Sequence, residues 1–104
     1  MRPRTTGPTP FQLQCMEVTT RRMKAAGARR DVAFERIEGR RETYYKATLG
    51  GASQAVEIFV YTDEAGFMVD GRDWRIFERP DFASEEDLLE NFLDALTAHL
   101  PQDQ

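Results

Sequence analysis

The sequence predicts a single α+β domain: an antiparallel meander of about five strands, with a C-terminal helix packed on one face and an N-terminal helix. Two observations predict this class. The turn pairs Gly50-Gly51 and Asp70-Gly71 lie between runs rich in β-branched and aromatic residues, and residues 88–100 carry a continuous apolar helical face. The 104 residues suit one domain, which we place at residues 10–101, with flexible tails expected at residues 1–9 and 102–104.

The N-terminal helix is expected to run from Pro10 to Ala26 and to end at Gly27. Thr9 can cap its first turn, and Gln12 stands where a capping box needs Glu or Gln. A strand over residues 11–18 is the alternative, because apolar and polar residues alternate there. The start and stop signals favour the helix, whose two apolar stripes indicate contact with more than the sheet, for example with a second subunit.

The strands are expected to begin at residues 32–37 and 42–49, followed by a two-residue turn at Gly50-Gly51 that pairs Tyr45 with Val56. That pairing gathers an apolar set on one face of the sheet: Tyr45, Ala47, Leu49, Val56, Ile58 and Val60. The opposite face then carries a mixed set: Tyr44, Lys46, Thr48, Glu57, Phe59 and Tyr61.

A second two-residue turn at Asp70-Gly71 would pair Val69 with Arg72 and Phe67 with Trp74. The sequence therefore predicts that Trp74 is buried beneath the last helix. The other face of this hairpin would carry Met68, Asp73, Arg75 and Phe77.

The last helix has the strongest signals in the chain. Ser84 can cap it, Asp87 stands at the third helical position, and Pro101 ends it. Its apolar face is formed by Leu88, Leu89, Phe92, Leu93, Leu96 and Leu100. We expect this face to cover the side of the sheet that holds Phe67, Trp74, Ile58 and Val60.

Composition limits the classes of protein that the chain can belong to. No apolar run approaches the ~20 residues that span a bilayer, and the N-terminus does not resemble a secretory signal. One cysteine excludes an internal disulfide and fits a cytoplasmic location. The net charge of −4 is uneven: residues 1–46 carry +6 and residues 47–104 carry −10.

The sequence contains no motif for catalysis, a metal or a cofactor. His99 is the only histidine and is expected near the end of the last helix, where its charge would complement the helix dipole. Cys15 is the only thiol and stands among apolar residues, as a small core residue does. A Cys15–His99 dyad has no surrounding motif to support it. The glycines match no phosphate-binding pattern, so we expect neither a cofactor nor enzymatic activity.

The second sheet face holds more aromatic surface than a solvated face needs. Its candidate protein-interface residues are Tyr44, Phe59, Tyr61, Met68, Arg75 and Phe77. Three occupants compete for this face: the N-terminal helix, a protein partner or second copy of the chain, and stacked nucleotide bases.

A basic cluster lies at the end of the first helix, where it complements the helix dipole or contacts a polyanion. It consists of Arg21, Arg22, Lys24, Arg29 and Arg30. The leading hypothesis is a non-enzymatic protein-binding or regulatory module, either a homodimer or a partner of another protein. The alternatives are a nucleic-acid-binding protein that uses the basic cluster, and a small-molecule binder or enzyme without a recognisable motif.

Overall fold

A computed structural model describes residues 7–25, 32–50 and 55–98 and confirms the predicted α+β class. Five strands form one antiparallel sheet whose strand order is the order of the chain. The elements are α1 (Pro10–Ala25), β1 (Glu35–Glu38), β2 (Thr43–Gly50), β3 (Ala55–Val60), β4 (Glu64–Val69), β5 (Asp73–Glu78), a 3₁₀ turn (Arg79–Asp81) and α2 (Glu85–Ala98).

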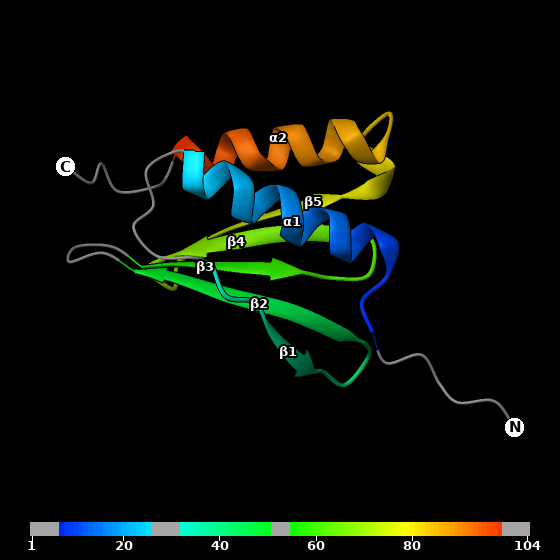
Figure 1. The fold of residues 1–104 in the computed structure, drawn as a ribbon, viewed down its shortest axis with the longest axis horizontal. Coiled ribbons are helices and arrows are strands. Elements are labelled where there is room, and N and C mark those ends of the chain that lie inside the picture. Colours follow the sequence, from blue (N-terminus) through cyan, green and yellow to red (C-terminus); the bar gives the residue numbers. More distant parts are fainter. Residues whose placement is uncertain (1–6, 26–31, 51–54, 99–104) are drawn as a thin grey trace, which may run out of the picture.

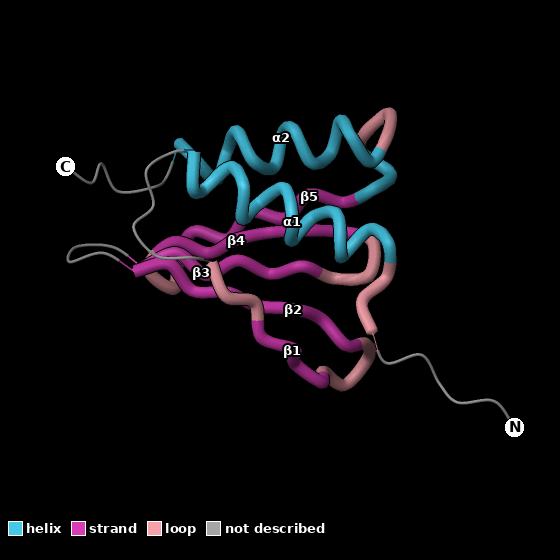
Figure 2. The backbone as a smooth tube through the Cα atoms, in the orientation of Figure 1, coloured by secondary structure: helices cyan, strands magenta, loops and turns pink. Residues whose placement is uncertain are grey.

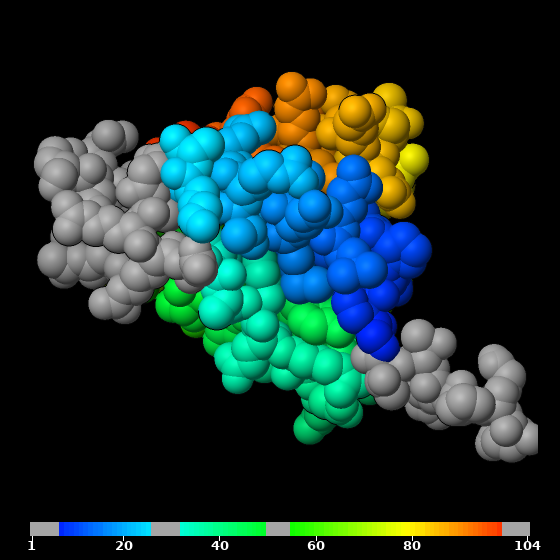
Figure 3. Space-filling model, in the orientation of Figure 1, coloured from blue at the N-terminus to red at the C-terminus, as the bar shows by residue number. Residues whose placement is uncertain are grey.

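Both helices lie on the same side of the sheet (Figure 1), and the backbone tube shows the same two layers (Figure 2). In the space-filling view α1 and α2 lie directly against each other (Figure 3). The N-terminal helix was one of three predicted occupants of the second sheet face. It lies on the other side of the sheet, so it does not cover that face.

The first helix begins where its capping signals predict. The Gln12 amide donates to Thr9 Oγ1 at 3.1 Å, and the Thr9 amide donates to Gln12 Oε1 at 2.9 Å. Gln12 Nε2 also donates to the Thr43 carbonyl at 3.4 Å, which connects this end of α1 to β2. The alternative strand over residues 11–18 is wrong, and the expected stop at Gly27 lies outside the described residues.

The Ser84 cap of the last helix forms as predicted, whereas the Asp87 carboxylate reaches the Ala83 amide and not the Ser84 amide that a capping box requires. The Asp87 amide donates to Ser84 Oγ at 3.0 Å, and the Ala83 amide donates to Asp87 Oδ2 at 3.4 Å. Five of the six predicted apolar positions are buried: Leu88, Leu89, Phe92, Leu93 and Leu96. The sixth, Leu100, lies outside the described residues, as does Pro101.

The pairing of β2 with β3 differs from the predicted one by four residues. Tyr45 pairs with Val60, and Gly50 pairs with Ala55. The predicted Gly50-Gly51 turn is wrong because residues 51–54, which lie outside the described residues, separate the two strands. A shift by an even number keeps every side chain on its predicted face, since side chains alternate with a period of two. β1 is shorter than the predicted strand at residues 32–37 and begins at Glu35.

The pairing of β4 with β5 differs from the predicted one by a single residue. Asp70 and Gly71 do form the turn, with φ angles of 54° and 70°, and the Arg72 amide donates to the Val69 carbonyl at 3.0 Å. Val69 nevertheless pairs with Asp73, so that Arg72 is an extra residue between the turn and the strand. A one-residue shift exchanges the two faces of β5.

This shift overturns the predicted burial of Trp74. Trp74 lies on the sheet face away from the helices and is 40% exposed. Phe77 lies beneath the helices instead, with ring centroids 6.4 Å from Phe67 and 5.8 Å from Phe92. Two large apolar residues of β5 have therefore exchanged their predicted environments.

The core lies between the helices and the sheet. Its largest fully buried side chains include Phe67 and Ile58 from the sheet, Met23 from α1, and Phe92 and Leu96 from α2. The exposed large apolar side chain on α1 is Leu13, at 55%.

Replacing Trp74 with Ala is expected to lower the free energy of unfolding by about 1 kcal/mol or less, because the half-exposed ring loses only its surface contacts. Replacing Phe67 with Ala is expected to cost about 3–5 kcal/mol, because a fully buried ring leaves a cavity. Urea denaturation of both variants measures the contrast. Equal losses would contradict the β4–β5 pairing described here.

Candidate functional site

The sheet face opposite the two helices is the main candidate surface, and we name it the open face. Among the described residues no helix covers it (Figure 1). Its larger side chains come from all five strands and the segment after β3: Ile37, Tyr44, Lys46, Glu57, Phe59, Tyr61, Met68, Trp74 and Ile76. All of them retain partial exposure or more.

Four rings on the open face form a continuous row of contacts, which we name the aromatic row: Tyr44, Tyr61, Phe59 and Trp74. The ring centroids of Tyr44 and Tyr61 are 5.0 Å apart, and those of Tyr61 and Phe59 are 6.3 Å apart. Trp74 meets Phe59 edge to face at 5.2 Å. These are favourable separations for aromatic pairs, so the rings hold one another in place.

Gly66 lies on β4, the strand between the two residues of the last contact. Phe59 on β3 and Trp74 on β5 flank β4, so their backbones lie two strand spacings apart, roughly 10 Å. The rings meet at 5.2 Å only by leaning over β4. Gly66 pairs with Phe59 on one side and Ile76 on the other, and a Cβ at this position would lie 2.5 Å from the Arg75 carbonyl oxygen and 2.9 Å from Ile76 Cδ1. A side chain at this position would therefore collide with β5, which accounts for the glycine.

Among the described residues, one ion pair lies on the open face. Lys46 Nζ is 3.3 Å from Glu57 Oε2 and 5.8 Å from the centroid of the Phe59 ring. The lysine thus combines a salt bridge with a cation–π contact. This arrangement shows that the row accepts a positive charge against its ring faces.

Four of the six predicted interface residues share the open face: Tyr44, Phe59, Tyr61 and Met68. Arg75 and Phe77 do not, because the one-residue shift places both on the helix side of β5, where the Arg75 guanidinium carbon is 5.4 Å from the Phe77 ring centroid. The sequence did not predict Trp74 on this face. Pairing β4 with β5 across a three-residue turn, residues 70–72, instead of a two-residue turn would have placed it there.

Carboxylates lie near the Tyr61 end of the row, and we name them the acidic rim: Glu42 and Glu64, which act on Tyr61, and Asp63 and Glu78, which act on Glu64. Glu42 Oε1 accepts hydrogen bonds from the amide and hydroxyl of Thr62 at 3.0 and 2.6 Å. Partial burial raises the pKa of Tyr61, and Tyr44, Glu42 and Glu64 raise it further. The pKa of Glu64 is also raised, first by burial and then by the other rim carboxylates.

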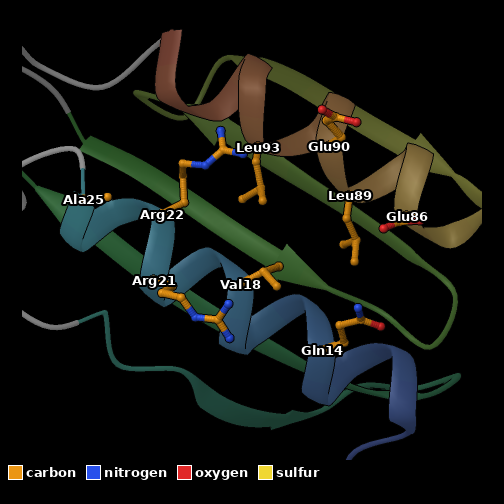
Figure 4. A pocket seen from close by; sticks show the side chains of 9 residues that line it. All are labelled: Gln14, Val18, Arg21, Arg22, Ala25, Glu86, Leu89, Glu90 and Leu93. Atoms are coloured by element: carbon orange, nitrogen blue, oxygen red, sulfur yellow. The ribbon is translucent and has the colours of Figure 1, made fainter.

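An open groove of about 480 Å³ runs between α1 and α2 on the other side of the molecule (Figure 4). One wall carries Arg21 and Arg22, and the other carries Glu86 and Glu90. The Arg22 side chain reaches across toward α2, where its Nη1 lies 3.3 Å from Asp94 Oδ1. This ion pair therefore neutralises one positive charge of α1 with one negative charge of α2.

The basic cluster is only partly described. Arg21 Nη2 lies 3.0 Å from Glu17 Oε2, and Arg22 pairs with Asp94. Lys24 is exposed at the end of α1. Arg29 and Arg30 lie outside the described residues. The two described arginines thus face carboxylates of the same chain, which lowers their attraction for a polyanion.

The single cysteine is placed as a core residue. Cys15 is fully buried, and this burial raises the pKa of its thiol from 9.0 to about 12, although the neighbouring Thr19 hydroxyl opposes the shift slightly. A thiol with that pKa is a poor nucleophile at neutral pH. His99, the other half of the dyad considered above, lies outside the described residues.

The described residues contain neither a metal-binding cluster nor a helix that could cross a membrane. No group of three or more His, Cys, Asp and Glu side chains is placed to hold a metal ion within residues 7–25, 32–50 and 55–98. Neither of the helices in these ranges has the length and apolarity to span a bilayer. Comparison with protein-family models, curated proteins and solved structures yields no match.

The buried thiol predicts a stability change at alkaline pH. The unfolded chain releases the Cys15 proton near pH 9, whereas the folded chain keeps it up to about pH 12. The contribution of this thiol to the free energy of unfolding is therefore fully present below pH 9.0. As the pH rises from the unfolded to the folded pKa, that contribution falls by up to about 1.4 kcal/mol per pH unit.

Urea denaturation of the wild type and of Cys15→Ala, repeated from neutral to alkaline pH, measures this effect. The variant is expected to be the less stable protein at neutral pH, because it contains a small cavity. The difference should shrink above about pH 9, while all other titrating groups cancel between the two proteins. A constant difference would contradict the assigned burial of the thiol.

Binding of the chain to a random DNA duplex is expected to be weak at physiological salt. The ion pairs of Arg21 and Arg22 and the net charge of −4 both work against a polyanion. A fluorescence-polarisation titration with a labelled duplex measures this affinity. Tight, sequence-dependent binding at that salt would favour the nucleic-acid hypothesis instead.

Proposed function

We propose that this chain is a non-enzymatic protein-binding module and that the open face is its binding surface. One observation carries the proposal: both helices pack on one side of the sheet, while the four contacting rings of the aromatic row lie on the other side. A regulatory role in the cytoplasm belongs to the same proposal, and the single free cysteine supports that location.

The composition of the open face supports a protein partner. Aromatic side chains and methionine are enriched in protein interfaces, and tryptophan and tyrosine often supply most of the binding energy. Trp74, Tyr61 and Met68 place these residue types on one continuous surface. Contiguous apolar surface of a few hundred Å² on a small domain usually has a binding role.

The rigidity of the open face supports the same conclusion. The rings belong to β2, β3, β5 and the residue after β3 in one hydrogen-bonded sheet, and they contact one another. Little side-chain entropy remains to be lost when a partner covers them, which favours affinity.

Charge argues against stacked nucleotide bases as the occupant. The acidic rim stands near the Tyr61 end of the row, where it would repel a phosphate backbone. Lys46, which lies beside Phe59, is already paired with Glu57. A base-stacking sheet instead needs positive charge beside its rings to hold the strand.

A photo-crosslinking amino acid placed at Met68 tests the proposal. We expect adducts when the protein is irradiated in cells, and an adduct of twice the chain mass would identify a second copy as the partner. The same probe at Leu13, an exposed apolar position on α1, is the matched control. Adducts should form at Met68 and fail to form at Leu13.

The double variant Phe59→Ser and Trp74→Ser, carrying the probe at Met68, completes the test. It should keep its fold by circular dichroism, because both side chains are partly exposed, and it should lose the adducts. Adducts that form equally at Leu13, or that survive the double substitution, would refute the open face as the binding surface.

A further inference from the structure

We propose that the Tyr44–Tyr61 end of the open face binds an arginine side chain of the partner protein. The inference rests on the proposed protein-binding function and names the chemistry of the contact. Two tyrosine rings 5.0 Å apart and a rim of four carboxylates together provide what a guanidinium group requires.

The rings supply the surface on which a guanidinium stacks. Tyr44 and Tyr61 are partly exposed, and their planes are tilted by 40°. An aromatic face carries partial negative charge and attracts a cation placed above it. Lys46 makes such a contact with Phe59 in the same row. A second cation at the tyrosine end would repeat this interaction with a partner's side chain.

The acidic rim supplies the hydrogen-bond acceptors. Glu64 stands directly opposite Glu78 in the sheet, and like charges on neighbouring strands repel each other. None of the rim carboxylates forms an ion pair with another described residue. A cation bound between Glu64 and Glu78 would relieve the repulsion between their carboxylates. Its binding there is therefore more favourable than at an isolated carboxylate.

Arginine fits this site better than lysine. Its planar group stacks on a ring and at the same time donates two parallel hydrogen bonds to a carboxylate. The ammonium group of lysine is compact and strongly hydrated, and it does not combine these two contacts. Arg40 and Arg41, which precede Glu42 in the chain, are exposed in the turn between β1 and β2.

Nuclear magnetic resonance titration tests the proposal with a short capped peptide in which arginine alternates with glycine. The ring signals of Tyr44 and Tyr61 should shift on binding, and a matched lysine peptide should bind at least several-fold more weakly. A matched glutamate peptide should not bind. If the arginine peptide leaves both tyrosine signals unchanged, the proposal fails.

Two charge-matched variants separate a specific site from general attraction to an acidic chain. Glu64→Gln with Glu78→Gln should weaken the arginine peptide roughly tenfold, since two charges leave the site. Glu86→Gln with Glu90→Gln removes the same charge from α2, on the other side of the molecule, and should change the affinity less than about twofold. Equal weakening in both variants would overturn the proposal.

A further variant and the crosslinking assay complete the design. Tyr61→Leu should reduce the preference for arginine over lysine, and an unchanged preference would overturn the stacking contact. Crosslinking at Met68 that continues unchanged in the Glu64→Gln and Glu78→Gln protein would refute the arginine contact. It would leave the protein-binding function of the open face standing.

Discussion

The packing of Phe77 against Phe67 and Phe92 determines what each face of the sheet presents. With Phe77 beneath the helices, alternation along β5 directs Trp74 and Ile76 to the opposite side. Trp74 can then reach across β4 to Phe59 and complete the aromatic row. Core and candidate interface are therefore two results of one pairing between β4 and β5.

Local features of the fold could be predicted from the sequence, whereas pairing between strands could not. The caps of both helices depend on residues three positions apart, and Thr9, Gln12 and Ser84 behave as predicted. The pairing of β5 depends on whether Arg72 joins the strand or the turn. Asp70-Gly71 fits either case, because its φ angles specify the turn and leave the following residue open.

The residues of the candidate site could be predicted wherever the sequence showed which side chains of a strand share a face. Tyr44, Phe59 and Tyr61 were placed correctly although the β2–β3 pairing was wrong, because an error of four residues preserves the alternation. Phe77 and Arg75 were misplaced by an error of one. The position of α1 was not predictable either, since its buried residues include Gln12 and Thr19 and give only a weak apolar face.

The strand order of the sheet has a consequence for how this chain folds. Each strand pairs with its neighbour in sequence, so every hairpin closes a short loop at low entropic cost. The contact between α1 and α2 instead joins segments as far apart as Arg22 and Asp94. Hairpins are thus expected to form early, and docking of the two helices is the late step that removes the apolar side of the sheet from water. Before α2 docks, that side is exposed together with the aromatic row. The partly folded sheet then exposes apolar surface on both faces, and both can associate with other chains.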